Sequence, residues 1–88
     1  EREIRALKAV ERIENEKPDE TVYGRTIRDN SDLSEKDVSW ASSRLEQKGL
    51  IEQDAQGSRT VKTMTEKGKD VLSHVRGVED LLDETIEP

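Results

Sequence analysis

The stretch from Leu33 to Thr65 decides the fold of this chain: LSEKDVSWASSRLEQKGLIEQDAQGSRTVKTMT. Ser34 is of the residue type that caps a helix start, and Asp37 completes a variant of the capping box. Apolar residues then recur at helical spacing, at Val38, Ala41 and Leu45. Gly49 ends the pattern, as glycine does where a helix terminates in a left-handed conformation. The stretch therefore predicts a capped amphipathic helix over residues 34–48.

Two short strands joined by a turn follow this helix. Residues 50–53 and 60–64 have the residue types of paired strands, and residues 54–59, with a Gly-Ser-Arg tip, form the loop between them. A helix followed directly by a basic-tipped hairpin is the layout of a winged helix-turn-helix, in which the helix enters a DNA major groove. The hairpin, or wing, then reaches the neighbouring backbone or minor groove. We therefore take residues 34–48 as a candidate recognition helix and residues 50–64 as a candidate wing.

Further helices flank this unit on both sides. An apolar stripe predicts a first helix over residues 2–16, which Pro18 ends. Thr21 is a candidate cap for a short second helix that runs to about Asp29, and Thr65 is a candidate cap for the last helix. The expected fold class is mainly α with a small β-hairpin (α+β), a winged helix-turn-helix of order helix, helix, helix, strand, strand, helix.

The last helix carries a candidate dimerisation seam, because its apolar positions alternate steps of four and three as in a coiled coil. Apolar residues make up only 30% of the 88 residues, so the core of a single copy is thin. We therefore expect a homodimer with candidate contacts at Ile4, Leu7, Val71, Val75, Val78 and Leu82, and the sequence leaves open whether both terminal helices or the last helix alone form the interface. The chain then divides into a DNA-binding domain over residues 1–69 and a dimerisation element over residues 70–88.

Composition excludes several classes of protein. The chain has no cysteine, which excludes disulfides and thiolate metal sites. No apolar run approaches the roughly 20 residues that cross a bilayer, and no signal-peptide pattern is present, so we expect a cytoplasmic protein without membrane contact. The net charge is −6, but residues 70–88 carry −5 of it, whereas residues 24–69 carry +1. The segment predicted to read DNA is therefore slightly basic.

The recognition-helix segment resembles a known family. Residues 38–51, VSWASSRLEQKGLI, resemble the V-S-x-x-x-x-x-L-E-x-x-G-L-I pattern of MarR-like winged-helix regulators. Residues 65–69, TEKGK, match the T-x-x-G segment that opens the helix after their wing. The resemblance covers about residues 19–72 and implies a winged helix that binds double-stranded DNA. The acidic bias and the single short C-terminal helix are most similar to small archaeal members, of the kind that includes a halophilic phage repressor.

Departures from the family limit what the resemblance implies. Longer members build their dimer and ligand pocket from extra helices at both ends, whereas here only residues 1–16 and 66–86 are available for that purpose. No small-molecule effector is therefore assigned. Trp40 stands where the family often has a polar or basic residue.

The polar face of the recognition helix supplies most of the candidate DNA contacts. Ser39 and Ser43 are short and let the helix sit deep in the major groove, where Lys36 reaches a phosphate or a guanine. Arg59, at the wing tip, suits a narrow A·T-rich minor groove, and the resemblance also implies a wing arginine there. The candidate DNA-binding residues are Arg25, Arg28, Ser34, Lys36, Ser39, Trp40, Ser43, Arg44, Arg59 and Lys62.

Several of these residues also have a purely structural interpretation. Trp40, as the one tryptophan in a thin core, is a candidate for half-buried packing against the second helix or the wing base. Arg25 and Arg28 fit phosphate contact on a helix that crosses the backbone, and they equally fit surface pairing with nearby aspartates. Arg44 either bonds a phosphate or pairs with an acid. These alternatives stay open at the level of sequence.

The sequence offers no readable catalytic centre. His74 is the only histidine, no glycine-rich phosphate loop is present, and no acidic pair stands in an apolar setting. We expect neither an enzyme nor a cofactor or metal. The leading hypothesis is a homodimeric, sequence-specific regulator of transcription that binds double-stranded DNA and acts as a repressor. The alternative, which the low charge of +1 over residues 24–69 favours, is a winged-helix protein–protein interaction module without DNA binding.

Overall fold

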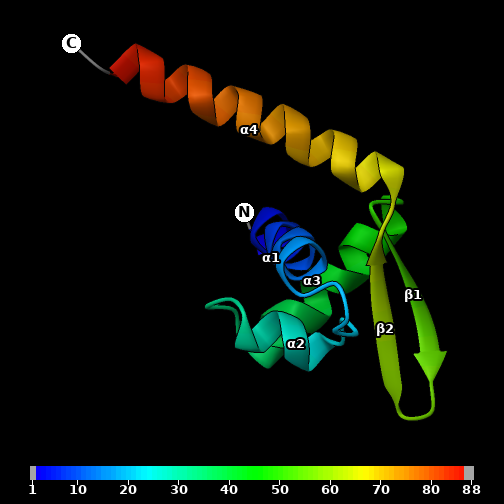
Figure 1. The fold of residues 1–88 in the computed structure, drawn as a ribbon. Coiled ribbons are helices and arrows are strands. Elements are labelled where there is room, and N and C mark those ends of the chain that lie inside the picture. The colour runs from blue at the N-terminus through cyan, green and yellow to red at the C-terminus, as the bar shows by residue number, and fades with distance from the viewer. Residues whose placement is uncertain (1, 87–88) are drawn as a thin grey trace.

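The computed structural model describes residues 2–86, with side chains through residue 83. Residue 1 of the predicted DNA-binding domain and residues 87–88 of the predicted dimerisation element lie outside the described residues. The elements follow in the order α1 (Arg2–Glu16), α2 (Gly24–Asp29), α3 (Glu35–Gln47), β1 (Ile51–Gln56), β2 (Arg59–Met64) and α4 (Glu66–Ile86) (Figure 1). The two strands form one antiparallel sheet. The fold is a winged helix of the α+β class, and the predicted element order is confirmed.

The core forms where α1 packs against α2, α3, α4 and β2. The apolar stripe of α1 faces inward, as its helical spacing predicts, and its buried residues are Ala6, Leu7, Ala9, Val10 and Ile13. Leu7 is only 1% exposed. It is therefore not available on the surface for the dimer contact expected of it, because the domain uses the same stripe to fill its own core.

Both ends of α3 form as their residues predict. The Ser34 hydroxyl oxygen accepts a hydrogen bond from the backbone N–H of Asp37 at 3.2 Å. At the other end, Gly49 has a φ of +75°, and the backbone N–H of Leu50 donates to the carbonyl of Leu45 at 2.9 Å. This is a Schellman motif, which satisfies carbonyls at the helix end. It also fixes the direction in which the chain leaves α3 to begin the wing.

The wing is longer, and its turn tighter, than the sequence predicts. The strands stay paired up to Gln56 and Arg59, so only Gly57 and Ser58 remain in the turn, whereas the sequence predicts a loop over residues 54–59. Gly57 has a φ of +66°, which a two-residue hairpin turn of type II′ requires at its first position. The tip of the wing is polar, so no alternating apolar pattern predicts the last residues of the strands. Backbone hydrogen bonds alone extend the strands there.

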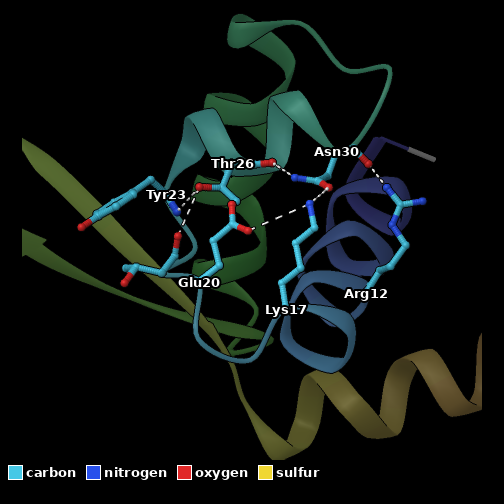
Figure 2. A network of polar contacts seen from close by, with 7 residues as sticks. Arg12, Lys17, Glu20, Tyr23, Thr26 and Asn30 are labelled. Carbon is cyan, nitrogen blue, oxygen red and sulfur yellow. Dashed lines mark hydrogen bonds and ion pairs between the residues drawn. The ribbon is translucent and has the colours of Figure 1, made fainter.

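The cap of α2 is Tyr23 rather than the predicted Thr21. The backbone N–H of Tyr23 donates to the Thr26 hydroxyl at 3.1 Å, and that hydroxyl donates to the carbonyl of Thr21 at 3.2 Å (Figure 2). The carbonyl of Val22 meanwhile accepts from the backbone N–H of Lys62 at 2.8 Å. The segment is thus held along β2, which delays the start of the helix.

Asn30 fixes the other end of α2 and ties it to α1. Its side-chain amide donates to the carbonyl of Thr26 at 2.8 Å, and its own backbone carbonyl accepts from the Arg12 guanidinium (Figure 2). The Lys17 ammonium donates to the Asn30 side-chain oxygen at 3.3 Å. Because α2 is held at both ends, the two arginines on its surface have a defined position relative to α3.

The start of α4 is built into the domain. The Thr65 hydroxyl oxygen accepts from the backbone N–H of Gly68 at 3.0 Å and confirms the predicted cap, while its proton goes to the carbonyl of Gly49 at 2.7 Å. A β carbon at Gly68 would lie 2.2 Å from the carbonyl oxygen of Leu50, so the close crossing of the two segments requires glycine. Leu72 is fully buried in the core. Beyond it, ion pairs of Arg76 with Glu11 and of Glu79 with Lys8 still join α4 to α1, and the helix extends away from the rest of the domain as a long arm (Figure 1).

Candidate nucleic-acid interface

The surface of α3 divides into three strips, because successive residues of a helix are turned by about 100°. Ser39 and Ser43 lie on the strip next to the wing. Lys36 is exposed on the middle strip, opposite the buried residues. Trp40 and Arg44 lie on the third strip, toward the first turn of α1. All five are on the surface, as predicted, but they occupy different flanks of the helix.

A groove of about 800 Å³ lies between α2, α3 and the wing. Six candidate DNA-binding residues from three elements line it, and they are Arg25, Arg28, Ser39, Ser43, Arg59 and Lys62. Carboxylates line it as well, from Glu20, Asp29 and Glu35. The fold thus brings together side chains that the sequence keeps far apart, and the local charge is close to balanced.

Arg59 stands at the tip of the wing and turns back over the groove. Its guanidinium carbon lies 5.1 Å from the centre of the Tyr23 ring, within the range of a cation–π contact. The contact holds an exposed arginine in a defined place without using its hydrogen-bond donors. Sequence reasoning missed this role of Tyr23, because no local pattern links a tyrosine before α2 to the tip of a distant hairpin.

The two arginines of α2 pair with carboxylates at the rim of the groove. Arg25 lies 3.9 Å from Asp29, and Arg28 lies 3.9 Å from Asp29 and 3.5 Å from Glu35. Side-chain exposure is 38% at Arg28 and 60% or more at the other three residues, and such pairs contribute only about 0–1 kcal/mol each. Surface pairing, one of the two interpretations of these arginines, is therefore present, and it is weak enough for a phosphate to replace it.

Lys62 departs from its expected role as a surface phosphate contact. It is 7% exposed at the floor of the groove, and its ammonium donates to the Gln53 side-chain oxygen at 2.9 Å and to the Thr60 carbonyl at 3.4 Å. Burial lowers the pKa of this ammonium, while the Glu46 carboxylate opposes the change. The Gln53 amide also donates to Glu46 at 3.1 Å, so Lys62 ties the wing to α3. The position of Lys62 on the inward face of β2 decides this role.

Ser34 and Lys36 lie outside the groove at the first turn of α3. The Ser34 hydroxyl accepts the capping hydrogen bond and retains its own proton, which a phosphate oxygen can accept. Lys36 is exposed. Both side chains therefore remain candidates for contacts to a nucleic acid beyond the groove.

Trp40 lies beside α1 rather than against α2 or the wing base, so the packing suggested as its structural alternative is not observed. Its side chain is 45% exposed. The guanidinium carbons of Arg2 and Arg44 lie 5.7 and 5.2 Å from its ring centre. This flank of α3 is thus a small cluster in which one ring holds two arginines, and sequence reasoning did not include Arg2 in it.

Glu3 organises the charges on the same flank. It accepts a hydrogen bond from the Lys48 ammonium and lies 3.6 Å from Arg44. The hydrogen bond from Lys48, with Arg44 acting in the same direction and burial opposing it, holds the pKa of the Glu3 carboxyl below its ordinary value. Glu3 therefore stabilises the folded state above the ordinary pKa of a carboxyl, and this contribution is lost as the pH falls through its folded pKa.

The residues expected in a dimer interface fall into two groups along the chain. Ile4, Val71 and Val75 are partly buried, and Val71 packs against the core. Val78 and Leu82 are 57% and 54% exposed. The inner part of the predicted seam is therefore occupied by the domain itself, whereas the outer part presents an apolar face on the surface of α4.

The described side chains offer little for other chemistry. Among them, no three or more His, Cys, Asp or Glu residues are arranged to hold a metal ion. Within residues 2–86, none of the helices combines the length and the apolar character needed to cross a membrane.

Comparison with known proteins identifies the fold. The chain matches no protein-family model and no curated protein sequence. The AF1382 protein of Archaeoglobus fulgidus superposes with a TM-score of 0.78 at 15% identity, over 92% of this chain and 87% of that one. BpsR of Bordetella bronchiseptica, whose DNA binding is regulated by 6-hydroxynicotinic acid, superposes with a TM-score of 0.76 at 11% identity, over 96% of this chain and 57% of that one. At such identities the likeness shows the winged-helix fold alone.

Proposed function

We propose that this chain is a MarR-like winged-helix regulator of transcription that binds a specific double-stranded DNA sequence and represses by covering a promoter. The observation that carries the proposal is the convergence of Ser39, Ser43 and Arg59 on one groove beside α3. The short serines let α3 sit deep in a major groove, which is about 12 Å wide. Arg59, placed by its contact with Tyr23, then enters the adjacent minor groove, where the potential is most negative. A regulator of this kind works in the cytoplasm, where its promoter is, and no effector is assigned to it.

The first test is direct binding of DNA by the full chain. Fluorescence anisotropy on a labelled random duplex should show salt-dependent affinity near 10⁻⁴–10⁻⁶ M, about the usual range for nonspecific binding. Selection from a random library should then return a palindrome whose half-sites are about 10 bp apart. Failure to bind any duplex at low salt would refute the proposal.

Arg59 gives a sharper test of the wing. Arg59→Ala should weaken specific binding by about 1–3 kcal/mol, because a guanidinium in the minor groove is lost. Lys69→Gln is the control for net charge, since Lys69 is exposed on α4 and pairs only weakly with Glu66, at 3.6 Å on the same helix. Equal losses of affinity in the two variants would show that Arg59 contributes only its positive charge and makes no specific contact in the minor groove.

Ser39 tests whether α3 reads bases. Ser39→Ala should change the preferred base at one position of the selected site more than it changes overall affinity, because its hydroxyl is short and points to a base edge in the proposed complex. Ser73→Ala, an exposed serine on α4, is the matched control. Identical selected sites for the wild type, Ser39→Ala and Ser73→Ala would remove α3 as the reading helix.

The proposed regulator is a homodimer that pairs the outer part of α4 with the same segment of a second copy. Val78 and Leu82 supply an exposed apolar face there, and a two-fold interface buries the same residues from both copies. Leu82→Asp should convert a dimer into a monomer in sedimentation velocity and abolish binding to a full palindrome. The neighbouring change Asp83→Asn is the control and should leave the mass of the sedimenting species that of a dimer. A wild-type chain that sediments as a monomer at all concentrations would contradict this part of the proposal.

A protein–protein interaction module is the second candidate, and specific observations favour it. The charge over residues 24–69 is only +1, and Arg28 already faces two carboxylates, from Asp29 and Glu35. Such a module would show no salt-dependent affinity for any duplex, so the anisotropy titration separates the two functions.

A further inference from the structure

The flank of α3 that faces away from the wing carries a built arrangement of charges that the proposed contacts do not use. Trp40 projects from α3, and Arg44 follows it one turn later on the same helix, with its guanidinium 5.2 Å from the ring centre. Arg2 approaches the same ring from the first turn of α1, at 5.7 Å. Two guanidinium groups from different elements are therefore held by one exposed aromatic ring.

The carboxylates on this flank hold the arginines only weakly. Arg2 lies 3.5 Å from Asp37, and Arg44 lies 3.6 Å from Glu3. The side chains of Arg2 and Arg44 are 59% and 46% exposed, so water weakens both pairs, and Glu3, which is 20% exposed, keeps its hydrogen bond from Lys48 when Arg44 turns to another partner. A phosphate that offered two oxygens to a planar guanidinium would compete well with either carboxylate.

We infer that Arg2, Trp40 and Arg44 form a second site for the DNA backbone, in which the ring presents both arginines to the phosphates of one strand. This inference rests on the proposed function. A helix with its side chains is about 10–12 Å across and fills a major groove, so a phosphate strand runs along each of its sides. The arginines of α2 contact the strand beside the wing, and Arg59 enters the minor groove next to it. Arg2 and Arg44 serve the opposite strand, and α3 is clamped from both flanks.

The ring has a definite part in this arrangement. A guanidinium stacked on an indole keeps its donors at its edge, and it is more weakly hydrated than an ammonium. The arginines therefore lose less freedom when they meet a phosphate than they would as free surface chains. Trp40 is a positioning residue here, and the two arginines are the binding residues.

The test compares Arg2→Gln, Arg2→Lys and the control Lys69→Gln in anisotropy titrations over a series of salt concentrations. Loss of one phosphate contact should reduce the slope of log affinity against log salt by about one for Arg2→Gln, and lower affinity roughly fivefold at low salt. Arg2→Lys should keep the slope, because it keeps the charge, and lose part of the affinity. Lys69→Gln should change neither quantity.

Two further measurements separate the site from a structural effect. Asp37→Asn should tighten binding more in the wild type than in the Arg2→Gln background, because only in the wild type does the change release Arg2 from its carboxylate. Trp40 is the only tryptophan, so its emission should change when DNA binds to the wild type and change less in Arg2→Gln.

The outcomes are distinct for the two proposals. A wild-type chain that binds DNA while Arg2→Gln keeps its slope and affinity would overturn the second site and leave the proposed function standing. A wild-type chain that binds no duplex would overturn both. Unchanged Trp40 emission on saturation with DNA would also overturn the second site.

Discussion

The two halves of α4 both carry apolar residues at helical spacing, but their surroundings are opposite. The first half, up to about Val75, crosses the start of the wing at Gly68 and completes the core with Leu72. In the second half, Val78 and Leu82 are exposed and Gly77 stands in open space, although the ion pair of Glu79 with Lys8 joins this half to α1. Apolar residues recur at helical spacing through both halves. This spacing shows which face of the helix is apolar, but it does not show which segment packs on that face. Tertiary contacts cover that face in the first half, and a second copy is proposed to cover it in the other.

Leu72→Ala should give the largest loss of stability along α4. Leu72 is fully buried, and truncating such a leucine costs about 2–5 kcal/mol through lost transfer energy and a cavity. Urea unfolding followed by circular dichroism measures the change, and it should not depend on protein concentration. Val78→Ala should instead give a loss that appears only at concentrations where the chain is dimeric. A loss of stability in Leu72→Ala that depends on protein concentration would contradict the assignment of the first half of α4 to the core of a single copy.

Gly68→Ala should come next, with a loss of about 3 kcal/mol. Its β carbon would meet the Leu50 carbonyl oxygen at 2.2 Å, and overpacking of this kind costs about 1–3 kcal/mol where the backbone has to shift. The same urea titration measures it. An unchanged midpoint would show that α4 and the wing are not in the close contact described here.

Gly77→Ala should have the opposite sign. Apart from the adjoining residues of its own helix, no atom lies within 4 Å of the β carbon that the change adds, and alanine is favoured over glycine inside a helix by about 1 kcal/mol. The variant should unfold at a higher urea concentration than the wild type. Together with Gly68→Ala it gives two identical substitutions on one helix with opposite effects, and a loss of stability at Gly77 would contradict the exposed position of the second half.

Glu79→Gln should have the smallest effect. The Lys8 ammonium donates to both oxygens of the Glu79 carboxylate, at 2.9 and 2.8 Å, and this pair joins the second half of α4 to α1. Because both side chains are partly exposed, the loss should be about 0.5 kcal/mol at low salt and vanish in about 1 M salt. Asp80→Asn makes the same change of charge one residue later and is the control. Equal effects of the two variants would show that net charge alone is responsible.

The sequence was most informative where a local hydrogen bond or a fixed backbone angle decides the structure. Ser34 and Thr65 cap their helices as predicted, and Gly49 ends α3 with a positive φ. It was least informative where the deciding partner is distant. A backbone hydrogen bond from Lys62 to Val22 holds the segment before α2 against β2, where the helix does not yet begin, and the polar wing tip gave no pattern for the last residues of both strands.

For the candidate site, residue types in the sequence were enough to identify the side chains that lie there, but not the role of each side chain. Arg25, Arg28 and Arg59 do line one groove with the serines of α3. The pattern could not show that Lys62 faces inward to Gln53, nor that Arg2 reaches Trp40 across the fold. Such contacts depend on the register of a hairpin and on the crossing of two helices, and the spacing of residues along one element predicts neither.

By itself, the sequence determined the order of the elements, the caps of α3 and α4 and the face of each helix that is apolar. These follow from interactions within a few residues, whose geometry is the same in any protein. The tertiary structure alone decided that Leu7 fills the core, that Tyr23 supports Arg59, and that the apolar seam of α4 is half covered. Those outcomes depend on how separate segments pack, and the free energy of packing belongs to the contact between them rather than to either segment.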